Sequence, residues 1–78
     1  MTDYNKEIGE WLAKERKKQR ISQRRMADIL GVSKSAIHYW ETGKRTIYAQ
    51  SMMDYCEALH ADPNELIWDV THRVGDVA

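Results

Sequence analysis

The sequence has few of the residues that interrupt or crosslink a small fold. Its 78 residues include one cysteine (Cys56), one proline (Pro63), four glycines and no phenylalanine. A single cysteine excludes a disulfide within the chain, so stability has to come from helix packing, from a partner subunit or from a ligand. No apolar run approaches the roughly 18 residues of a membrane span, and no signal-peptide core is present, so we expect a cytoplasmic protein without membrane contacts.

The sequence also lacks strand patterns, because no segment alternates apolar and polar residues over the ~4–8 positions that a half-buried strand needs. Apolar residues recur at helical spacing and predict an all-α fold of five helices, at about residues 4–19, 22–30, 33–42, 48–60 and 62–72. We expect one domain over residues 1–72 and a flexible tail over residues 73–78. The apolar stripes of the helices predict the core residues, which are Ile8, Trp11, Leu12, Met26, Ala27, Ile29, Leu30, Ile37, Trp40, Met52, Tyr55, Cys56, Leu59, Leu66, Ile67 and Val70.

The formal net charge is zero, but the charges are segregated along the chain. Residues 14–45 hold ten lysines and arginines against three acidic residues, a net charge of +7, whereas residues 1–13 carry −2 and residues 46–78 carry −5. A neutral molecule of this kind presents a positive field to phosphates on one face. The alternative is that these charges only solvate helix surfaces.

The segment from Ser22 to Arg45 has spacings that suit two closely crossing helices. Ser22 and Ser33 are good N-caps for these helices. Ala27 is small enough for a close crossing, and Gly31 permits the positive φ that a short turn needs. The short link turns the outer face of the later helix toward solvent, and an α-helix fits the major groove of B-DNA.

Spaced matches extend this pattern over most of the chain. They are Ile8-Gly9, Leu12, Arg16, Ile21-Ser22-Gln23, Gly31-Val32-Ser33, Ile37, Trp40-Glu41, Gly43-Lys44-Arg45, Asp62, Glu65 and Leu66. Over residues 8–67 the chain thereby resembles the Cro/CI-type (XRE) helix-turn-helix family of phage repressors, bacterial regulators and antitoxins. The resemblance implies a five-helix, lambda-repressor-like domain that binds double-stranded DNA, with the helix-turn-helix formed by the second and third helices.

The resemblance also implies roles for individual residues. The residues expected to contact bases are Lys34, Ser35, His38 and Tyr39. For His38, a solvated or phosphate-contacting ring is an equally good interpretation. The residues expected to contact phosphates are Gln23, Arg20, Arg24, Ser33, Lys44 and Arg45. The alternative for Gln23 is an ordinary first-turn residue of the helix, and the alternative for Arg20 and Arg24 is a surface residue without a DNA contact. Arg16 and Glu41 are expected to form a structural ion pair.

The main hypothesis is a transcriptional repressor that binds a pseudo-palindromic operator as a homodimer, with Ile67, Trp68 and Val70 as the candidate interface residues. One alternative is an antitoxin, in which the acidic C-terminal half of this chain binds a toxin. The same acidic half could instead bind an antirepressor protein. Another is the N-terminal domain of a longer repressor. No catalytic constellation or cofactor motif is present, so we expect neither an enzyme nor a cofactor. Cys56 and His60 lack further ligands at useful spacing, so we expect no metal site.

Overall fold

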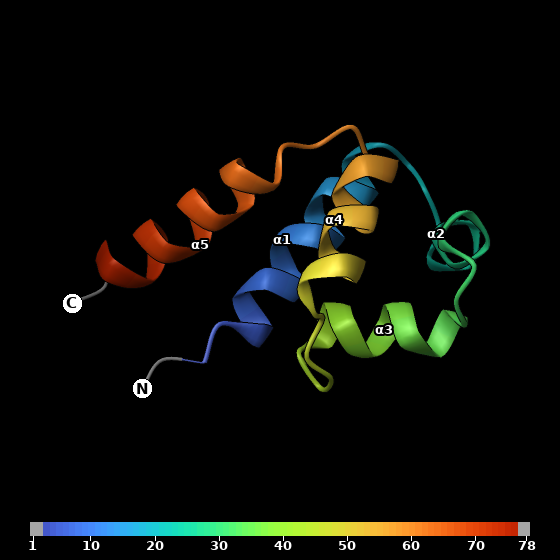
Figure 1. Ribbon diagram of the computed structural model, residues 1–78, viewed down its shortest axis with the longest axis horizontal. Coiled ribbons are helices and arrows are strands. Elements are labelled where there is room, and N and C mark those ends of the chain that lie inside the picture. Colours follow the sequence, from blue (N-terminus) through green and yellow to red (C-terminus); the bar gives the residue numbers. More distant parts are fainter. Residues whose placement is uncertain (1–2, 77–78) are drawn as a thin grey trace.

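The computed structural model describes the backbone of residues 3–76 and the side chains of residues 3–72. Over this range the chain forms five helices and no strand (Figure 1). The predicted all-α, five-helix fold is confirmed. None of the described helices combines the length and the hydropathy of a membrane span. The helices are α1 (Asn5–Lys18), α2 (Gln23–Leu30), α3 (Lys34–Thr42), α4 (Ala49–Ala58) and α5 (Pro63–Asp76).

Local signals set the turn between α2 and α3. The Ser22 hydroxyl accepts a hydrogen bond from the Arg25 amide and starts α2, and the Ser33 hydroxyl accepts one from the Ala36 amide and starts α3, both at 3.0 Å. Gly31 ends α2 with a φ of 69° in the left-handed region, which glycine adopts without a side-chain clash. The predicted caps and turn are therefore present, and α3 leaves the turn in a fixed direction.

The core lies where α1 packs against α3 and α5, and where α2 and α4 close the remaining side. Two predicted core residues are wrong, because Ile29 and Ile67 are 45% and 49% exposed. One residue turns a helix by about 100°. α5 turns Leu66 and Val70 inward, so Ile67 lies on the open flank. The largest fully buried side chains are Tyr55, Leu12, Met26, Ile37, Leu59, Leu66 and Cys56.

The last helix is longer than predicted. Its backbone stays helical to Asp76, four residues past the predicted boundary at residue 72. Gly75 does not interrupt it, because one glycine costs a helix only about 1 kcal/mol. The predicted tail over residues 73–78 is thus helical in its first part, and residues 77 and 78 lie outside the described residues.

Side-chain hydrogen bonds fix α1 against the C-terminal half of the chain. The Trp11 indole Nε1 donates to Oδ2 of Asp69 at 2.9 Å, which joins α1 to α5. Gln19 follows α1 and donates through Nε2 to the backbone oxygen of Leu59 at 2.7 Å. The first bond ties α5 to α1, and the second ties the end of α1 to the C-terminus of α4.

Candidate nucleic-acid interface

The outer face of α3 carries the four side chains predicted to contact bases. Lys34, Ser35, His38 and Tyr39 are all exposed, while Ile37 and its neighbours on the inner face are buried. Positions i, i+1, i+4 and i+5 share one side of a helix, so one exposed surface presents all four. This helix lies along one edge of the molecule (Figure 1). The surface formed by these four residues is called the α3 face below.

A shallow hollow joins the α3 face to the start of α2. Its lining consists of Gln23 together with Lys34, Ser35, His38 and Tyr39. Gln23 is the first residue of α2, where free backbone N–H groups favour an anion. The structure therefore brings the predicted glutamine and the predicted base-contacting residues together at one site.

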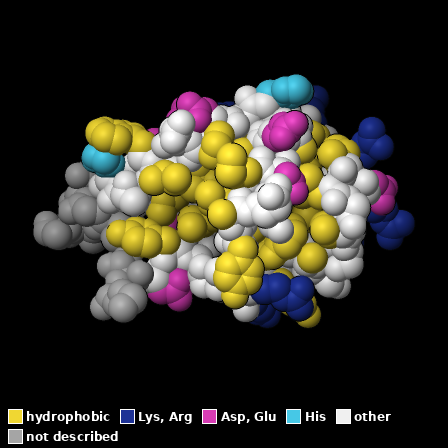
Figure 2. Space-filling model, viewed as in Figure 1, with side chains coloured by type: hydrophobic (Ala, Val, Ile, Leu, Met, Phe, Trp, Pro, Cys, Tyr) yellow, Lys and Arg dark blue, Asp and Glu magenta, His cyan; other side chains and the backbone are white. Residues whose placement is uncertain are grey.

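The loop after α3 adds positive charge beside the same face. Lys44 and Arg45 are both exposed. The Arg45 guanidinium carbon lies 5.3 Å from the centroid of the Tyr39 ring, within the range of a cation–π contact. The Arg45 amide also donates to the Tyr39 carbonyl at 3.2 Å. In Figure 2, Lys and Arg side chains gather beside this loop and at the α2 end of the molecule.

The remaining predicted phosphate contacts are Arg20, Arg24 and Ser33. Arg20 and Arg24 are exposed, but neither lines the hollow beside the α3 face. Arg20 has a φ of 58°, so it turns the chain between α1 and α2 in the left-handed region. The Ser33 oxygen accepts the Ala36 amide as a cap, which leaves its hydroxyl proton available to a phosphate oxygen.

Arg16 and Glu41, predicted to pair, lie buried in a bidentate ion pair between α1 and α3. Arg16 Nε lies 2.7 Å from Glu41 Oε2, and Arg16 Nη2 lies 2.9 Å from Oε1. Arg16 Nη1 donates to the Ile21 carbonyl at 2.6 Å, which fixes the chain just before α2. Both side chains are less than a tenth exposed. Bidentate geometry makes this pair specific in direction as well as strong.

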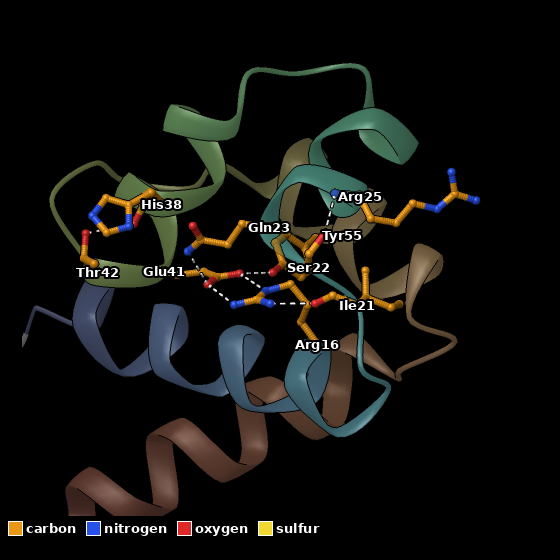
Figure 3. A network of polar contacts seen from close by, with 9 residues as sticks. All are labelled: Arg16, Ile21, Ser22, Gln23, Arg25, His38, Glu41, Thr42 and Tyr55. Carbon is orange, nitrogen blue, oxygen red and sulfur yellow. Dashed lines mark hydrogen bonds and ion pairs between the residues drawn. The ribbon is translucent and has the colours of Figure 1, made fainter.

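Two further side chains bond to Glu41, and the sequence reasoning missed both (Figure 3). The Tyr55 hydroxyl, on α4, donates to Glu41 Oε2. The Gln23 amide Nε2, on α2, donates to Oε1 at 3.1 Å. A buried tyrosine usually finds a partner for its hydroxyl, which was the one available signal for Tyr55. Glu41 therefore joins four helices, and one N–H of Gln23 is already engaged within the protein.

The charge states of this network follow from its contacts. Burial raises the pKa of the Glu41 carboxyl, but hydrogen bonds from Arg16, Tyr55 and Gln23 outweigh burial and hold that pKa below its usual value. The hydrogen bond to Glu41 raises the pKa of Arg16. Burial, and then the hydrogen bond to Glu41, raises the pKa of Tyr55. At neutral pH the network thus holds a charged pair and a neutral tyrosine.

Cys56 and His60, for which no metal site was predicted, differ in exposure. Cys56 is fully buried, and burial raises the pKa of its thiol. His60 is exposed in the turn after α4. Among the described residues, no group of three or more His, Cys, Asp or Glu side chains is placed to hold a metal ion.

Comparisons with known proteins bear on this geometry. The sequence model of the helix-turn-helix family matches residues 12–66. No curated protein matches the chain in sequence. Two crystal structures of the clp gene regulator ClgR from Corynebacterium glutamicum, both 18% identical, are similar in fold, with TM-scores of 0.85 and 0.87. These matches cover 94% and 95% of this chain and 95% and 79% of the ClgR chains.

A third similar structure is the restriction-modification controller protein C.AhdI from Aeromonas hydrophila. It is 26% identical, with a TM-score of 0.74 over 78% of this chain and 88% of its own. The likeness to ClgR shows the fold alone, and the matched family model covers the whole of α2, α3 and α4.

Proposed function

The chain belongs to the helix-turn-helix family of DNA-binding transcriptional regulators, and from this premise we propose that it is a repressor that reads a pseudo-palindromic operator as a homodimer. The α3 face enters the major groove, and the surrounding cations hold the backbone on either side. Residues 1–72 act as the DNA-binding domain. The observation that carries the proposal is the exposure of four polar side chains on one side of α3.

The chemistry of these side chains assigns each a partner on DNA. The Lys34 ammonium donates to guanine O6 or N7, and the Ser35 hydroxyl donates or accepts at either base type. His38 and Tyr39 extend the contact by one helical turn. Lys44 and Arg45 hold phosphates, which fixes register and adds salt-dependent affinity without reading sequence.

We expect Lys34→Ala to relax sequence preference at one position of each half-site. The loss of one base contact costs about 1–3 kcal/mol, or roughly 5- to 150-fold in affinity for the preferred duplex. Selection of binding sites from random duplexes, run with both proteins, measures it. The matched control is Lys44→Ala, which should weaken all duplexes by a similar factor. An unchanged selected motif with Lys34→Ala, or no motif with the unmodified chain, would contradict the assignment.

The dimer is proposed to form through the outer flank of α5. Ile67 and Trp68 are 49% and 61% exposed there, and Ile67 borders an apolar hollow lined from α1, α4 and α5. Val70 was predicted to share this surface, but it is 2% exposed and belongs to the core. The side of α5 that meets α1 and α4 buries it. Figure 2 shows hydrophobic side chains spread over the α4 and α5 side of the molecule.

We expect Trp68→Glu to weaken self-association at least tenfold, because it places a charge in an apolar contact. Sedimentation equilibrium over a range of protein concentrations measures the dissociation constant. The control is Tyr48→Glu, since Tyr48 is a 76% exposed aromatic at the start of α4, outside the proposed contact. Equal dissociation constants for the two variants would show that α5 is not the interface.

A further inference from the structure

A second, larger groove lies between α1 and α3 and adjoins the hollow beside the α3 face. Its lining comes from α1, from α3 and from Gln23 at the start of α2, and it includes Glu10, Lys14, Lys17, Lys18 and Glu41. Gln23 and His38 line both depressions. The groove therefore continues the proposed DNA-contacting surface onto α1, which precedes the helix-turn-helix itself.

The charge of this groove suits a polyanion. Lys14, Lys17 and Lys18 are exposed on α1, and Glu10 is the one acidic residue on the rim. The acidic group in the floor is Glu41, whose charge the buried Arg16 neutralises. The groove is thus net positive at its rim and close to neutral at its base. Phosphates that run along the rim would meet cations without entering the buried network.

The three lysines differ in what they already contact. Lys18 Nζ lies 3.2 Å from Oε1 of Glu15, so an acidic neighbour partly satisfies its charge. Lys14 and Lys18 both also line a separate depression toward α5, beside Glu65 and Asp69. Lys17 lines only the groove toward α3, among the described depressions. Lys17 is therefore the cation best placed for a ligand that continues from the α3 face, with Lys14 one helical turn before it.

The buried network orients the residue at the junction. Glu41 holds one amide N–H of Gln23, so the Gln23 side chain has a fixed position between the two depressions. Its second N–H remains available as a donor. A phosphate bound by that N–H and by the start of α2 would adjoin both the α3 face and the α1 groove, because Gln23 lines both depressions.

We infer that the groove between α1 and α3 is a DNA phosphate-binding site, in which Lys17 and Lys14 contact the backbone that flanks the bases read by α3. The inference rests on the proposed function and extends its contact surface to α1. The ligand is the DNA backbone rather than a free anion, because the groove opens into the α3 face and is a shallow extended channel without an enclosed anion pocket. Loss of these contacts should weaken binding to every duplex and leave the selected motif unchanged.

The test uses the full chain, with Lys14→Gln/Lys17→Gln and the control Lys18→Gln, and a duplex selected by the unmodified protein. Fluorescence anisotropy measures the dissociation constant as the salt concentration is raised from about 50 to about 300 mM, where phosphate contacts give a strong salt dependence. Each lost contact reduces the magnitude of the negative slope of log K against log salt by about 0.9. The double variant should lower it by about 1.8, and Lys18→Gln by less than half of one contact. Thermal melts followed by circular dichroism confirm that the variants fold.

Phosphate ethylation interference separates a direct contact from a general charge effect. The unmodified protein should show interference at flanking phosphates that the double variant loses and Lys18→Gln keeps. An unchanged salt slope and footprint in the double variant, with normal binding by the unmodified chain, overturns the inference alone. If inorganic phosphate binds at the groove but the double variant and the unmodified chain have equal DNA affinity, the inference is overturned as well. If the unmodified chain binds no duplex, the proposed function fails, and the inference falls with it.

Discussion

Replacing Glu41 by alanine is expected to lower the free energy of unfolding by about 3–5 kcal/mol, because it leaves the buried Arg16 charge without a counterion. The same change removes the acceptor of the Tyr55 hydroxyl and of the Gln23 amide. Domains of this size have total stabilities of roughly 5 kcal/mol or a little more, so the variant should be largely unfolded at moderate temperature. Urea unfolding followed by tryptophan fluorescence measures the loss.

An exposed ion pair on the same molecule provides the control. Glu15 pairs with Lys18 at the surface of α1, with the lysine side chain 62% exposed. Exposed pairs contribute about 0–1 kcal/mol, so Glu15→Ala should scarcely shift the urea midpoint. Equal losses for Glu41→Ala and Glu15→Ala would contradict the structural role of the buried network. The triple variant Arg16→Met/Glu41→Leu/Tyr55→Phe should recover part of the stability, since it removes both buried charges and the Tyr55 hydroxyl together and leaves only the Gln23 amide and the Ile21 carbonyl without their partners.

The pH dependence of the unfolding free energy tests the structural role of Glu41 independently. Its pKa is lower in the folded protein than the ordinary value of 4.5, mainly through Arg16 and Tyr55 acting against burial. A carboxyl with a depressed pKa contributes stability that is complete above its unfolded pKa and is lost as the pH falls through its folded pKa. The difference in unfolding free energy between the unmodified chain and Glu41→Gln should therefore be largest near neutral pH and shrink below about pH 4.5.

The elements that the sequence predicted correctly are those with local causes. Ser22, Ser33 and Gly31 act on residues within one turn of themselves, so their roles follow from the neighbouring sequence. The orientations of Ile29 and Ile67 were wrong because apolar residues stand on more than one side of α2 and of α5, so spacing alone does not identify the buried stripe. Which flank of α2 or α5 stays open depends on where the other helices lie, and sequence spacing within one helix does not contain that information.

In the candidate site, too, the features predicted correctly have local causes or come from the family resemblance, and the features that were missed join different helices. The exposed face of α3 follows from its own amphipathic pattern, and the resemblance supplied the Arg16 and Glu41 pairing. The bonds of Gln23 and Tyr55 to Glu41 cross 18 and 14 residues of sequence and join different helices. The α1 groove likewise depends on how closely α1 approaches α3. Contacts of this kind exist only once the tertiary arrangement is known.

That close approach depends on Gly9, a position of the family pattern whose physical cause becomes visible only in the packing of α1 on α3. A methyl group placed on Gly9 would lie 2.5 Å from the Glu41 carbonyl oxygen and closer still to that of Trp40. Both oxygens belong to the backbone of α3, so no side-chain rotation relieves the contact. The two helices would have to move apart, which would also stretch the ion pair between Arg16 on α1 and Glu41 on α3.

Gly9→Ala is therefore expected to cost about 3 kcal/mol or more, at the upper end of overpacking effects, because backbone rather than side chains must move. The gain in helix propensity from glycine to alanine, about 1 kcal/mol, is too small to offset it. The control is Gly31→Ala, where φ is 69° but a methyl group would meet nothing within 4 Å. Backbone strain alone predicts a cost of about 1–2 kcal/mol there. Chemical unfolding of both variants decides the matter: if Gly9→Ala were as stable as the unmodified chain, α1 would not be held against α3 by this contact, and the groove between them would lose its fixed shape.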